Sequence, residues 1–375
     1  MERTRALCIF PTLLGGKTAT ATIIKALNRV RDLEATYVLV DTEDYQRLPA
    51  PWWTPPTNFG RVRYMARKKA SKLLGQKFDL LFVRTWELVV AFSDIAKCVP
   101  AAALFDATPA TLEAEFRNRP FKIWQRALAY SVYHRAFAKA ARQFDFFLPK
   151  GSDCADSLEY DYKIPRERCF LTLAPQSIDS WTPTARTYTS PARLLFVANN
   201  FALKGGDFLL RLYGNHLANK CTLTIASNDP AVAARFLPPG VTWLRGKSRE
   251  QLLEIYRQSD LFVFPTQQDF VPEAVAEALA TGLPCLVNDL RGIRDLVKDG
   301  KTGFVFPRNA PVEAWADRIQ RLIADHGELA RMSASARAFA VEMLNQDRFD
   351  NLIAHVVDRL RSDVAKQAAR GRVVA

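Results

Sequence analysis

The sequence is poor in the residues that build metal sites and disulfide frameworks. Its 375 residues include four histidines and six widely scattered cysteines, and no Cys-x-x-Cys pair occurs. A structural zinc site or a disulfide framework is therefore not expected, and a reducing compartment such as the cytoplasm fits best. The chain also lacks any Asp-x-Asp motif, which argues against a fold that binds a diphosphate through a divalent metal.

Long apolar runs are missing as well. No run approaches the ~18 residues that a membrane span needs, so we expect no transmembrane helix. The first residues, MERTRALCIFPTLLGG, place two arginines before a short apolar run, as signal peptides do. Pro11 interrupts that run and no Ala-x-Ala cleavage site follows. We therefore interpret the run as the first strand of a core.

A glycine pair follows this strand. Gly15-Gly16-Lys17-Thr18 stands between the apolar run and a helix-like run, as in a phosphate-binding P-loop. The P-loop pattern G-x-x-x-x-G-K-[ST] requires its first glycine at position 11. Pro11 stands there, and it has neither the N–H nor the free φ that the loop needs. We therefore predict a glycine turn that lines a cleft between two domains.

The charge of the chain is strongly basic, with a formal net charge of +13. Two segments, 61–72 and 117–143, carry many lysines and arginines, several aromatic residues and no acid. Three interpretations are open: a solvated helix face, contact with an anionic membrane surface or lipid-linked substrate, and nucleic-acid binding. No nucleic-acid recognition motif accompanies the segments, so nucleic acid is the least favoured partner.

Short apolar runs alternate with helical patterns along the chain, such as the helix that Ser248 and Gln251 predict as a capping box. The runs are continuous, which is typical of parallel strands buried on both faces and indicates an α/β architecture. The expected strands lie at 5–10, 36–40, 79–84, 102–105, 144–149 and 169–174, and again at 193–198, 221–226, 241–245, 261–265, 284–288 and 303–306.

These runs form two similar halves. The segment 180–193, rich in Pro, Ser and Thr, is the expected linker. We predict two Rossmann-like domains over residues 1–183 and 184–345, followed by a helical tail over 346–375 that packs back on the first domain. Ligands of open parallel sheets bind beyond the carboxyl ends of the strands. The cleft between the two sheets is therefore the expected site.

The segment DFVPEAVAEALATGLPCLV (269–287) places two carboxylates near one helix start. Asp269 precedes Pro272, which suits the first turn of a helix, and Glu277 lies inside that helix. Two such carboxylates could accept paired hydrogen bonds from the vicinal hydroxyls of a ribose or a pyranose. The alternative is an ordinary amphipathic helix with Glu273 and Glu277 on its wet face.

The segment FVANNFALKGG (196–206) ends a strand and then offers Asn199, Lys204 and two glycines. A lysine beside a glycine turn at the edge of a sheet can neutralise a diphosphate, because its ammonium is a point charge with three donors. The backbone N–H groups of Phe270 and Val271 could bind further oxygens. The alternative is a surface lysine before a flexible turn.

Together these segments resemble the retaining, nucleotide-sugar-dependent glycosyltransferases of GT-B fold, family four. The matching stretches are the Lys-Gly turn at 199–206, the acids Asp269 and Glu277 eight residues apart, Glu-Ala-x-Ala-x-Gly-x-Pro at 277–284, and segments 291–306 and 175–183. In the first half, Gly15-Gly16 and FDATP (105–109) resemble the family's first domain. The resemblance spans nearly the whole chain and is strong in the second half.

The resemblance implies a role for each matching residue. Lys204 would contact the donor diphosphate, Glu277 the nucleotide ribose, and Asp269 a hydroxyl of the transferred sugar. Asp106 is a candidate for binding the acceptor hydroxyl. The expected donor-binding residues are thus Gly15, Gly16, Asn199, Lys204, Phe270, Val271 and Glu277, and the expected catalytic residues are Lys204, Asp269 and Asp106.

Three positions depart from the family pattern. Asn199 stands where arginine is usual, and Asp269 stands where glutamate is usual. Phe105, next to Asp106, stands where many members have histidine. These departures remove one charge partner of the diphosphate and alter the sugar-binding details, so an inactive member is an alternative.

The resemblance implies transfer of a sugar from a nucleotide diphospho-sugar to a glycan or lipid-linked acceptor, with retention of anomeric configuration. Synthesis of cell-surface polysaccharide, lipopolysaccharide or glycolipid is the expected context. No metal and no other cofactor are expected. The expected location is cytoplasmic, with contact to an anionic membrane surface at the inner face of the cell membrane. A sugar-nucleotide epimerase and a non-catalytic protein that binds sugar nucleotides or glycans are the alternatives.

Overall fold

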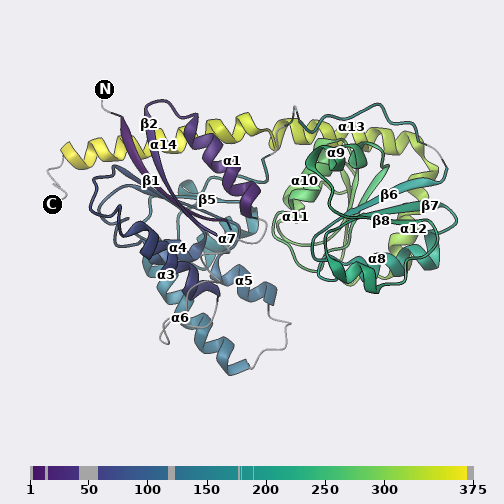
Figure 1. Ribbon diagram of the computed structural model, residues 1–375, viewed down its shortest axis with the longest axis horizontal. Helices are drawn as coiled ribbons and strands as arrows, with labels where there is room; N and C mark the ends of the chain where they lie inside the picture. Colours follow the sequence, from purple (N-terminus) through teal and green to yellow (C-terminus); the bar gives the residue numbers. More distant parts are fainter. Residues whose placement is uncertain are drawn as a thin grey trace. The chain divides into compact units, whose positions relative to one another are not determined.

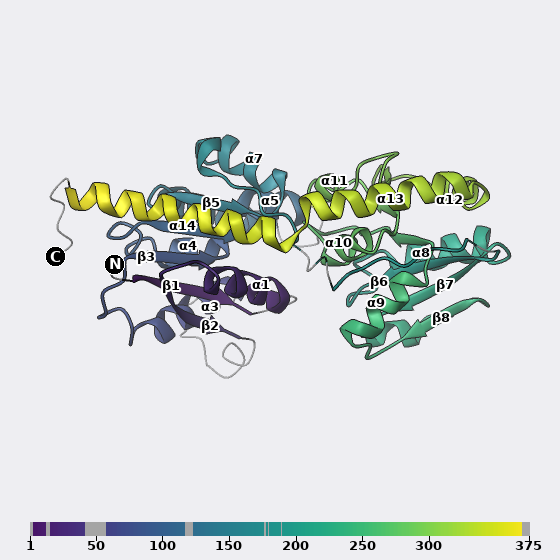
Figure 2. The ribbon, with the colours of Figure 1, turned by 90° about the horizontal axis from the view of Figure 1, so that it is seen from above.

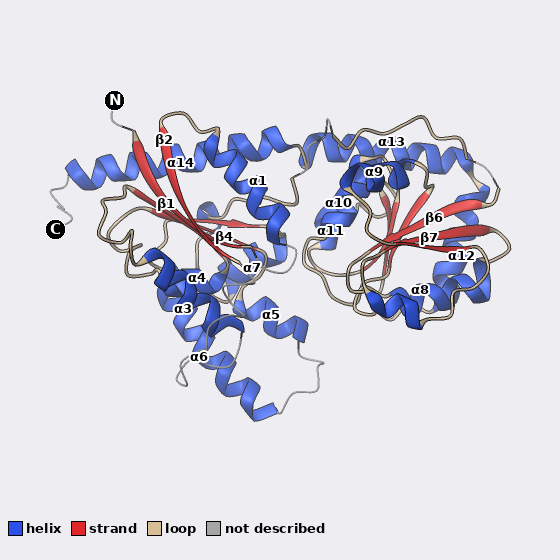
Figure 3. Cartoon of the chain, viewed as in Figure 1, coloured by secondary structure: helices blue, strands red, loops and turns tan. Residues whose placement is uncertain are grey.

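The computed structural model describes residues 3–12, 16–41, 58–116, 123–175, 178, 180–188 and 190–369. The chain forms two compact units, one of residues 1–172 and 347–375 and the other of residues 173–346. Each unit is built around a parallel sheet with helices packed on it (Figures 1 and 3). The predicted α/β class with two Rossmann-like sheets is therefore confirmed.

The first sheet has five parallel strands in the order β2-β1-β3-β4-β5. Its strands are β1 (Thr4–Pro11), β2 (Leu33–Val40), β3 (Leu80–Arg84), β4 (Ala101–Phe105) and β5 (Phe146–Pro149). Every residue of β3, β4 and β5 is buried, as the continuous apolar runs predict. The strand order turns back between β1 and β3, so the switch point of this sheet lies at the carboxyl ends of those two strands.

Helices cover both faces of the first sheet. One face packs against α3, α4, α6 and α7, and the other packs against α1 and α14. The helices of this unit are α1 (Gly16–Asn28), α3 (Asn58–Ala70), α4 (Trp86–Ala91), α5 (Pro109–Phe116), α6 (Ile123–Ala141), α7 (Ser152–Tyr160), the 3₁₀ turn η1 (Arg166–Arg168) and α14 (Gln346–Ala369).

The helix α14 is the last of the chain, yet it completes the core of the first unit. Its apolar side chains, among them Ile353 and Val357, are buried in one cluster with Phe10 of β1. Figure 2 shows the helix running along the sheet. Its polar side adds an ion pair between Arg29 and Asp350. A segment remote in sequence thus closes one face of this sheet.

The second sheet has six parallel strands in the order β11-β10-β9-β6-β7-β8. Its strands are β6 (Ala192–Val197), β7 (Cys221–Ala226), β8 (Val241–Leu244), β9 (Leu261–Phe264), β10 (Cys285–Asn288) and β11 (Gly303–Phe306). The order turns back between β6 and β9, so the switch point lies where the loops after these two strands begin.

The helices of the second unit follow its strands in turn (Figure 1). They are α8 (Gly206–Leu212), the π-helical turn η2 (Tyr213–Leu217), the 3₁₀ turn η3 (Pro230–Ala234), α9 (Arg249–Arg257), α10 (Glu273–Ala280), α11 (Ile293–Leu296), α12 (Val312–Ala324) and α13 (His326–Met343). The predicted capping box is present at α9, because Ser248 Oγ accepts from the Gln251 N–H and Gln251 Oε1 accepts from the Ser248 N–H.

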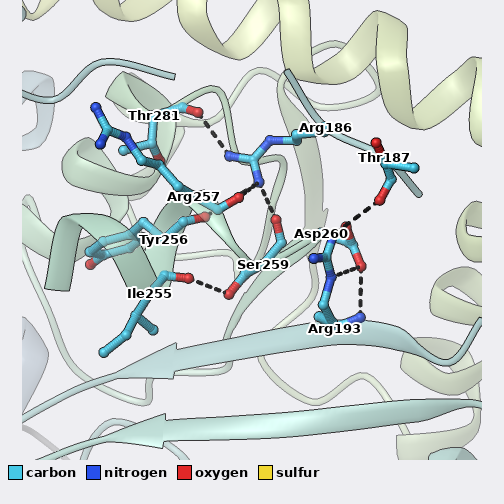
Figure 4. A network of polar contacts seen from close by, with 9 residues as sticks. All are labelled: Arg186, Thr187, Arg193, Ile255, Tyr256, Arg257, Ser259, Asp260 and Thr281. Atoms are coloured by element: carbon cyan, nitrogen blue, oxygen red, sulfur yellow. Dashed lines mark hydrogen bonds and ion pairs between the residues drawn. The ribbon is translucent and has the colours of Figure 1, made fainter. Parts of the chain in front are cut away.

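The predicted linker packs on the second unit rather than standing between domains. Figure 4 shows Arg186 donating to the carbonyl oxygens of Tyr256, Arg257 and Ser259, and to that of Thr281 at 2.8 Å. The carbonyls of Tyr256 and Arg257 end α9 and carry the negative end of its dipole, which favours a cation there, and Ser259 follows the helix. The linker thus belongs to the second unit, which begins at residue 173 rather than at the predicted residue 184.

The segment 169–174, predicted as a strand, is not one in the structure. The N–H groups of Phe170 and Thr172 donate to the carbonyls of Phe147 and Pro149, at 2.8 and 3.0 Å, so the segment starts beside β5. Leu173 then adopts a left-handed φ of 56°, which turns the chain out of the sheet direction.

Among the described helices, none is both long and apolar enough to span a bilayer.

Candidate functional site

The structure brings Lys204 and Asp269 together at the switch point of the second sheet. Lys204 lies in the loop after β6, and Asp269 lies in the loop after β9. Lys204 Nζ donates to Asp269 Oδ2 at 2.7 Å and to the Gln268 carbonyl at 2.8 Å. Both side chains are largely buried, with exposed fractions of 22% and 19%. The two residues predicted to meet the diphosphate and the sugar thus form one ion pair.

Two glycines allow the loops at the carboxyl ends of the second sheet's strands to approach one another closely. Gly205 has φ +84°, and a Cβ added to it would lie 2.0 Å from the Pro265 carbonyl oxygen. A Cβ added to Gly292 would lie 1.8 Å from the Phe270 carbonyl oxygen. Only glycine fits at such positions. The backbone itself therefore sets where Lys204 and Asp269 meet.

The backbone before α10 differs in detail from the prediction. Pro272 has an extended conformation and precedes the first helical residue, Glu273. The Phe270 N–H, predicted to bind donor oxygens, donates to Asp269 Oδ1 at 2.9 Å. An aspartate often satisfies a nearby N–H in this way. The side chain of Val271 is buried, and a donor contact by its N–H stays a prediction.

Glu277 is held by a buried tyrosine. Its Oε2 accepts from the Tyr256 hydroxyl at 3.1 Å, and that hydroxyl lies 3.2 Å from the Ala274 carbonyl oxygen. Tyr256 is fully buried and packs edge-to-face on Trp181, with ring centroids 5.5 Å apart. Tyr256 of α9, packed on Trp181 before β6, thus fixes the orientation of the Glu277 carboxyl.

The electrostatic surroundings of Glu277 disfavour its charged form. Burial, followed by the charge of Glu273, raises the pKa of Glu277 to about 7. The hydrogen bond from Tyr256 and the charge of Arg249 act in the opposite direction. Hydroxyl groups of a ligand would favour the ionised carboxylate, because they donate hydrogen bonds to it.

Asn199 and Arg308 also lie at the carboxyl ends of the strands of the second sheet. Asn199 Oδ1 accepts from the Asn228 N–H at 3.3 Å, so the side chain joins the loops after β6 and β7. Arg308 follows β11, and its Nη2 donates to the Gln267 carbonyl at 2.7 Å. Gln267 adjoins the carbonyl that Lys204 contacts. The edge therefore holds an arginine, although none stands at position 199.

In the first unit, Asp106 is anchored by Arg84. Arg84 ends β3, and its Nη2 donates to Asp106 Oδ2 at 3.2 Å. Its Nη1 donates to Thr20 Oγ1 at 3.2 Å and contacts the Pro11 carbonyl oxygen at 3.4 Å. The Arg84 side chain is 8% exposed and that of Asp106 is 43% exposed. One buried guanidinium therefore ties β1, α1 and β4 together and leaves a carboxylate accessible. Phe105, beside Asp106, is buried.

The predicted glycine turn is only partly visible. Gly15 lies outside the described residues, and Gly16 is the first residue of α1. A diphosphate contact by this turn therefore stays a prediction. Within the described ranges, no group of three or more His, Cys, Asp or Glu side chains is arranged to hold a metal ion. The expectation of a metal-free reaction also stays a prediction.

Comparison with known proteins assigns the second unit to a family. Residues 179–339 match the family described as glycosyl transferases group 1. The match lies within the second unit, residues 173–346. A D-inositol 3-phosphate glycosyltransferase of Xylanimonas cellulosilytica is 36% identical over an alignment of 210 residues, which covers 49% of this chain and 50% of that protein. A UDP-Gal:alpha-D-GlcNAc-diphosphoundecaprenol alpha-1,3-galactosyltransferase of Escherichia coli is 33% identical over 97 residues, 26% of this chain and 24% of that protein.

Solved glycosyltransferase structures share the fold. Sucrose-phosphate synthase from Thermosynechococcus elongatus superposes with a TM-score of 0.75 at 13% identity, covering 96% of this chain and all of that one. Anabaena Alr3699/HepE in complex with UDP superposes with a TM-score of 0.71 at 13% identity, covering 95% of this chain and 100% of that one. The chain therefore shares the GT-B fold of these structures. The chain spans about half or less of the length of the curated relatives it matches.

Sequence reasoning missed three residues that shape the strand ends of the two sheets. Tyr256 lies in a predicted helix, where the sequence does not distinguish it from an ordinary core aromatic residue. Its hydrogen bond to Glu277 is known only from the folded structure. Arg308 follows its strand without a motif. Arg84 did leave a signal, because it is a charged residue at the end of the fully buried run LLFVR, where a charge needs partners.

Proposed function

We propose that this protein transfers a sugar from a nucleotide diphospho-sugar to a glycan or lipid-linked acceptor, with retention of anomeric configuration. The observation that carries the proposal is the pairing of Lys204 with Asp269, at the switch point of a group 1 glycosyl transferase domain. Ligands of open parallel sheets bind at this point. UDP in the complex of the structural neighbour supports a nucleotide diphosphate as the ligand class.

Each residue of this edge has a chemical task in the proposal. The Lys204 ammonium neutralises charge that develops on the leaving diphosphate. Asp269 uses lone pairs that remain beside its two present hydrogen bonds to accept from a sugar hydroxyl. Glu277, oriented by Tyr256, accepts the hydroxyls of the nucleotide ribose. Arg308 is positioned to add a second positive charge.

The reaction is a substitution at the anomeric carbon. The bond from that carbon to the diphosphate oxygen breaks, and its electron pair leaves with the nucleoside diphosphate. A bond to the acceptor oxygen forms on the same face, and the acceptor proton passes to the departing phosphate oxygen. No enzymic base and no metal are needed, so catalysis rests on positioning and on stabilising the leaving group.

The test is release of nucleoside diphosphate from a panel of nucleotide sugars, with lipid-linked and glycan acceptors added. Glu277→Ala and Lys204→Ala are measured beside the wild type, with Lys220→Ala as an exposed-lysine control in the same unit. We expect release from one donor, lost in the first two variants and kept in the control. Donor binding without turnover would instead indicate a binding protein. Release of free nucleoside diphosphate that no acceptor stimulates would indicate the epimerase alternative.

The acceptor side is proposed to meet an anionic membrane. Lys68 at the end of α3 and Lys72 just beyond it are exposed, and Leu74 beside them is 37% exposed. Lysines near an anionic surface are each worth about 1 kcal/mol. Arg67 and Lys69 of the same segment instead contact Asp94 and the Leu39 carbonyl. The basic segment therefore divides into a structural part and an exposed part.

Flotation with vesicles tests the membrane proposal. The wild type should float with vesicles that contain anionic lipid and stay behind with neutral ones. Exchanging Lys68 and Lys72 for glutamate should abolish flotation, whereas the same exchange at Lys220 and Lys301, exposed lysines of the second unit, should not. Equal flotation on both vesicle types would contradict the proposal.

A further inference from the structure

The first unit has an unusual turn at its own switch point. Thr85 directly follows β3 and has φ 82° and ψ 147°. This conformation is nearly restricted to glycine, and it is least suited to a β-branched residue such as threonine. Strain of this kind persists only where the surrounding structure imposes it, and it clusters at functional sites. The position matters because ligands of open parallel sheets bind beyond the strands that flank the switch point.

Two residues on, Glu87 adds a second feature that packing does not explain. The residue is 92% buried, and its Oε2 has no hydrogen-bond partner among the described residues. The Thr85 hydroxyl approaches this carboxyl without reaching hydrogen-bond geometry, and it too lacks a partner in the described part of the chain. A buried polar atom left unpaired costs stability. Strain and unpaired atoms thus coincide at one turn.

The charges around Glu87 define what it can bind. Burial raises the pKa of Glu87 to about 7, while the charges of Arg63 on α3 and Arg84 on β3 act in the opposite direction. The carboxyl is thus ready to exchange hydrogen bonds in either protonation state. Trp86, the residue between Thr85 and Glu87, packs edge-to-face on Tyr133, with ring centroids 5.5 Å apart. A carboxyl and a hydroxyl beside aromatic rings suit a neutral sugar or polyol better than an anion.

We propose that Thr85 and Glu87 form the hydroxyl-binding part of the acceptor site, where they hydrogen-bond neighbouring hydroxyls of an acceptor sugar. Asp106, held by Arg84 at the same edge of the sheet, completes the polar surface. Glu87 is here a binding residue that sets acceptor affinity. This inference rests on the proposed function, and it adds the class of acceptor group and the residues that receive it.

The inference predicts that stability and acceptor binding change in opposite directions. Glu87→Met removes the unpaired oxygen and should raise the Tm by about 3 °C. The same variant, and the isosteric Glu87→Gln, should lower kcat/KM for the acceptor at least about tenfold. The probes are methyl glycosides of glucose, galactose and mannose, tested both as acceptors and as ligands that raise the Tm. Donor affinity, measured with nucleoside diphosphates, should not change.

A matched control separates binding from structure. Asp145 directly precedes β5, at the amino ends of the strands of the same sheet. Its Oδ2 accepts from the Ala101 N–H at 2.8 Å. Asp145→Asn should lower the Tm and leave the response to glycosides unchanged. A lower Tm in both Glu87 variants, with unchanged acceptor parameters, would overturn the inference. So would a wild type that no glycoside stabilises and that uses none. Nucleoside diphosphate binding, read in the same samples, shows separately whether the donor site exists.

Discussion

At the switch point of the second sheet the polar side chains are paired with one another, whereas at that of the first sheet the Thr85 hydroxyl and one carboxyl oxygen of Glu87 have no hydrogen-bond partner among the described residues. Lys204 has Asp269, and Glu277 has Tyr256. Arg84 and Asp106 also pair at the end of the first sheet, but Thr85 Oγ1 and Glu87 Oε2 have no such partner within the described residues. Two sheets of one architecture thus end in edges of different character.

The difference teaches how the two halves divide their tasks. A paired polar edge is stable without ligand, and breaking a pair costs stability as well as binding. A buried polar atom without a partner stores a cost that a ligand can repay, so replacing Glu87 should stabilise the fold and remove binding. In the proposed function, the second sheet would therefore provide a preformed donor site, and Thr85 and Glu87 would belong to an acceptor site that the substrate completes.

The largest effect should follow loss of the charge at the donor edge. Lys204→Met removes the ammonium that faces the diphosphate and leaves Asp269 without its cation. We expect kcat to fall about 10²–10³-fold, as for loss of a group that stabilises transition-state charge. Steady-state release of nucleoside diphosphate measures it. Lys220→Met, which affects an exposed contact to Gln320, should leave kcat unchanged, and an equal loss in both variants would break the comparison.

Substitutions at two glycines test the close approach of the backbone at Gly205 to the Pro265 carbonyl in the second unit. Gly205→Ala places a Cβ 2.0 Å from the Pro265 carbonyl oxygen at a positive φ, and it should cost about 3 kcal/mol or more. Gly246 also has a positive φ, of +61°, but open space around it. Gly246→Ala should therefore cost only about 1–2 kcal/mol. Chemical denaturation measures both free energies of unfolding, and similar losses would show that the approach to Pro265 is unimportant.

Removing one hydroxyl should affect both binding and stability. Tyr256→Phe frees the Glu277 carboxyl, so donor affinity should weaken about tenfold and stability should fall by about 1 kcal/mol. Tyr213 is its matched control. It is equally buried, and its hydroxyl contacts the carbonyls of Cys221 and Pro239. Tyr213→Phe should lower stability alone. Calorimetric titration with nucleoside diphosphate distinguishes the two, and unchanged affinity in Tyr256→Phe would mean that Tyr256 does not position Glu277.

Much of this architecture follows from local sequence, and the exceptions share a physical cause. Continuous apolar runs marked the strands because both faces of each sheet are covered. The local sequence also placed Lys204 and Asp269 in loops that follow strands, and the structure pairs these two residues. Segment 169–174 has the same apolar pattern, but Leu173 turns it out of the sheet. The contacts of Tyr256 and the missing partners of Glu87 depend on elements distant in sequence. Burial and pairing of that kind exist only after the chain has folded.

The smallest effect that we predict is the pH dependence of donor binding, which tests the role of the Glu277 carboxylate. Burial raises the pKa of Glu277 from its ordinary 4.5 to about 7. The folded state therefore penalises the ionised form, so the Glu277 contribution to the free energy of unfolding is most favourable below about pH 4.5 and is lost as the pH rises through about 7. Donor binding should respond in the opposite sense, because ribose hydroxyls favour the carboxylate. We expect donor affinity about tenfold higher at pH 8 than at pH 6. A nucleotide sugar is the right probe, since its diphosphate does not titrate there. Glu277→Gln should abolish this pH dependence, and a slope that persists in the variant would assign it to another group.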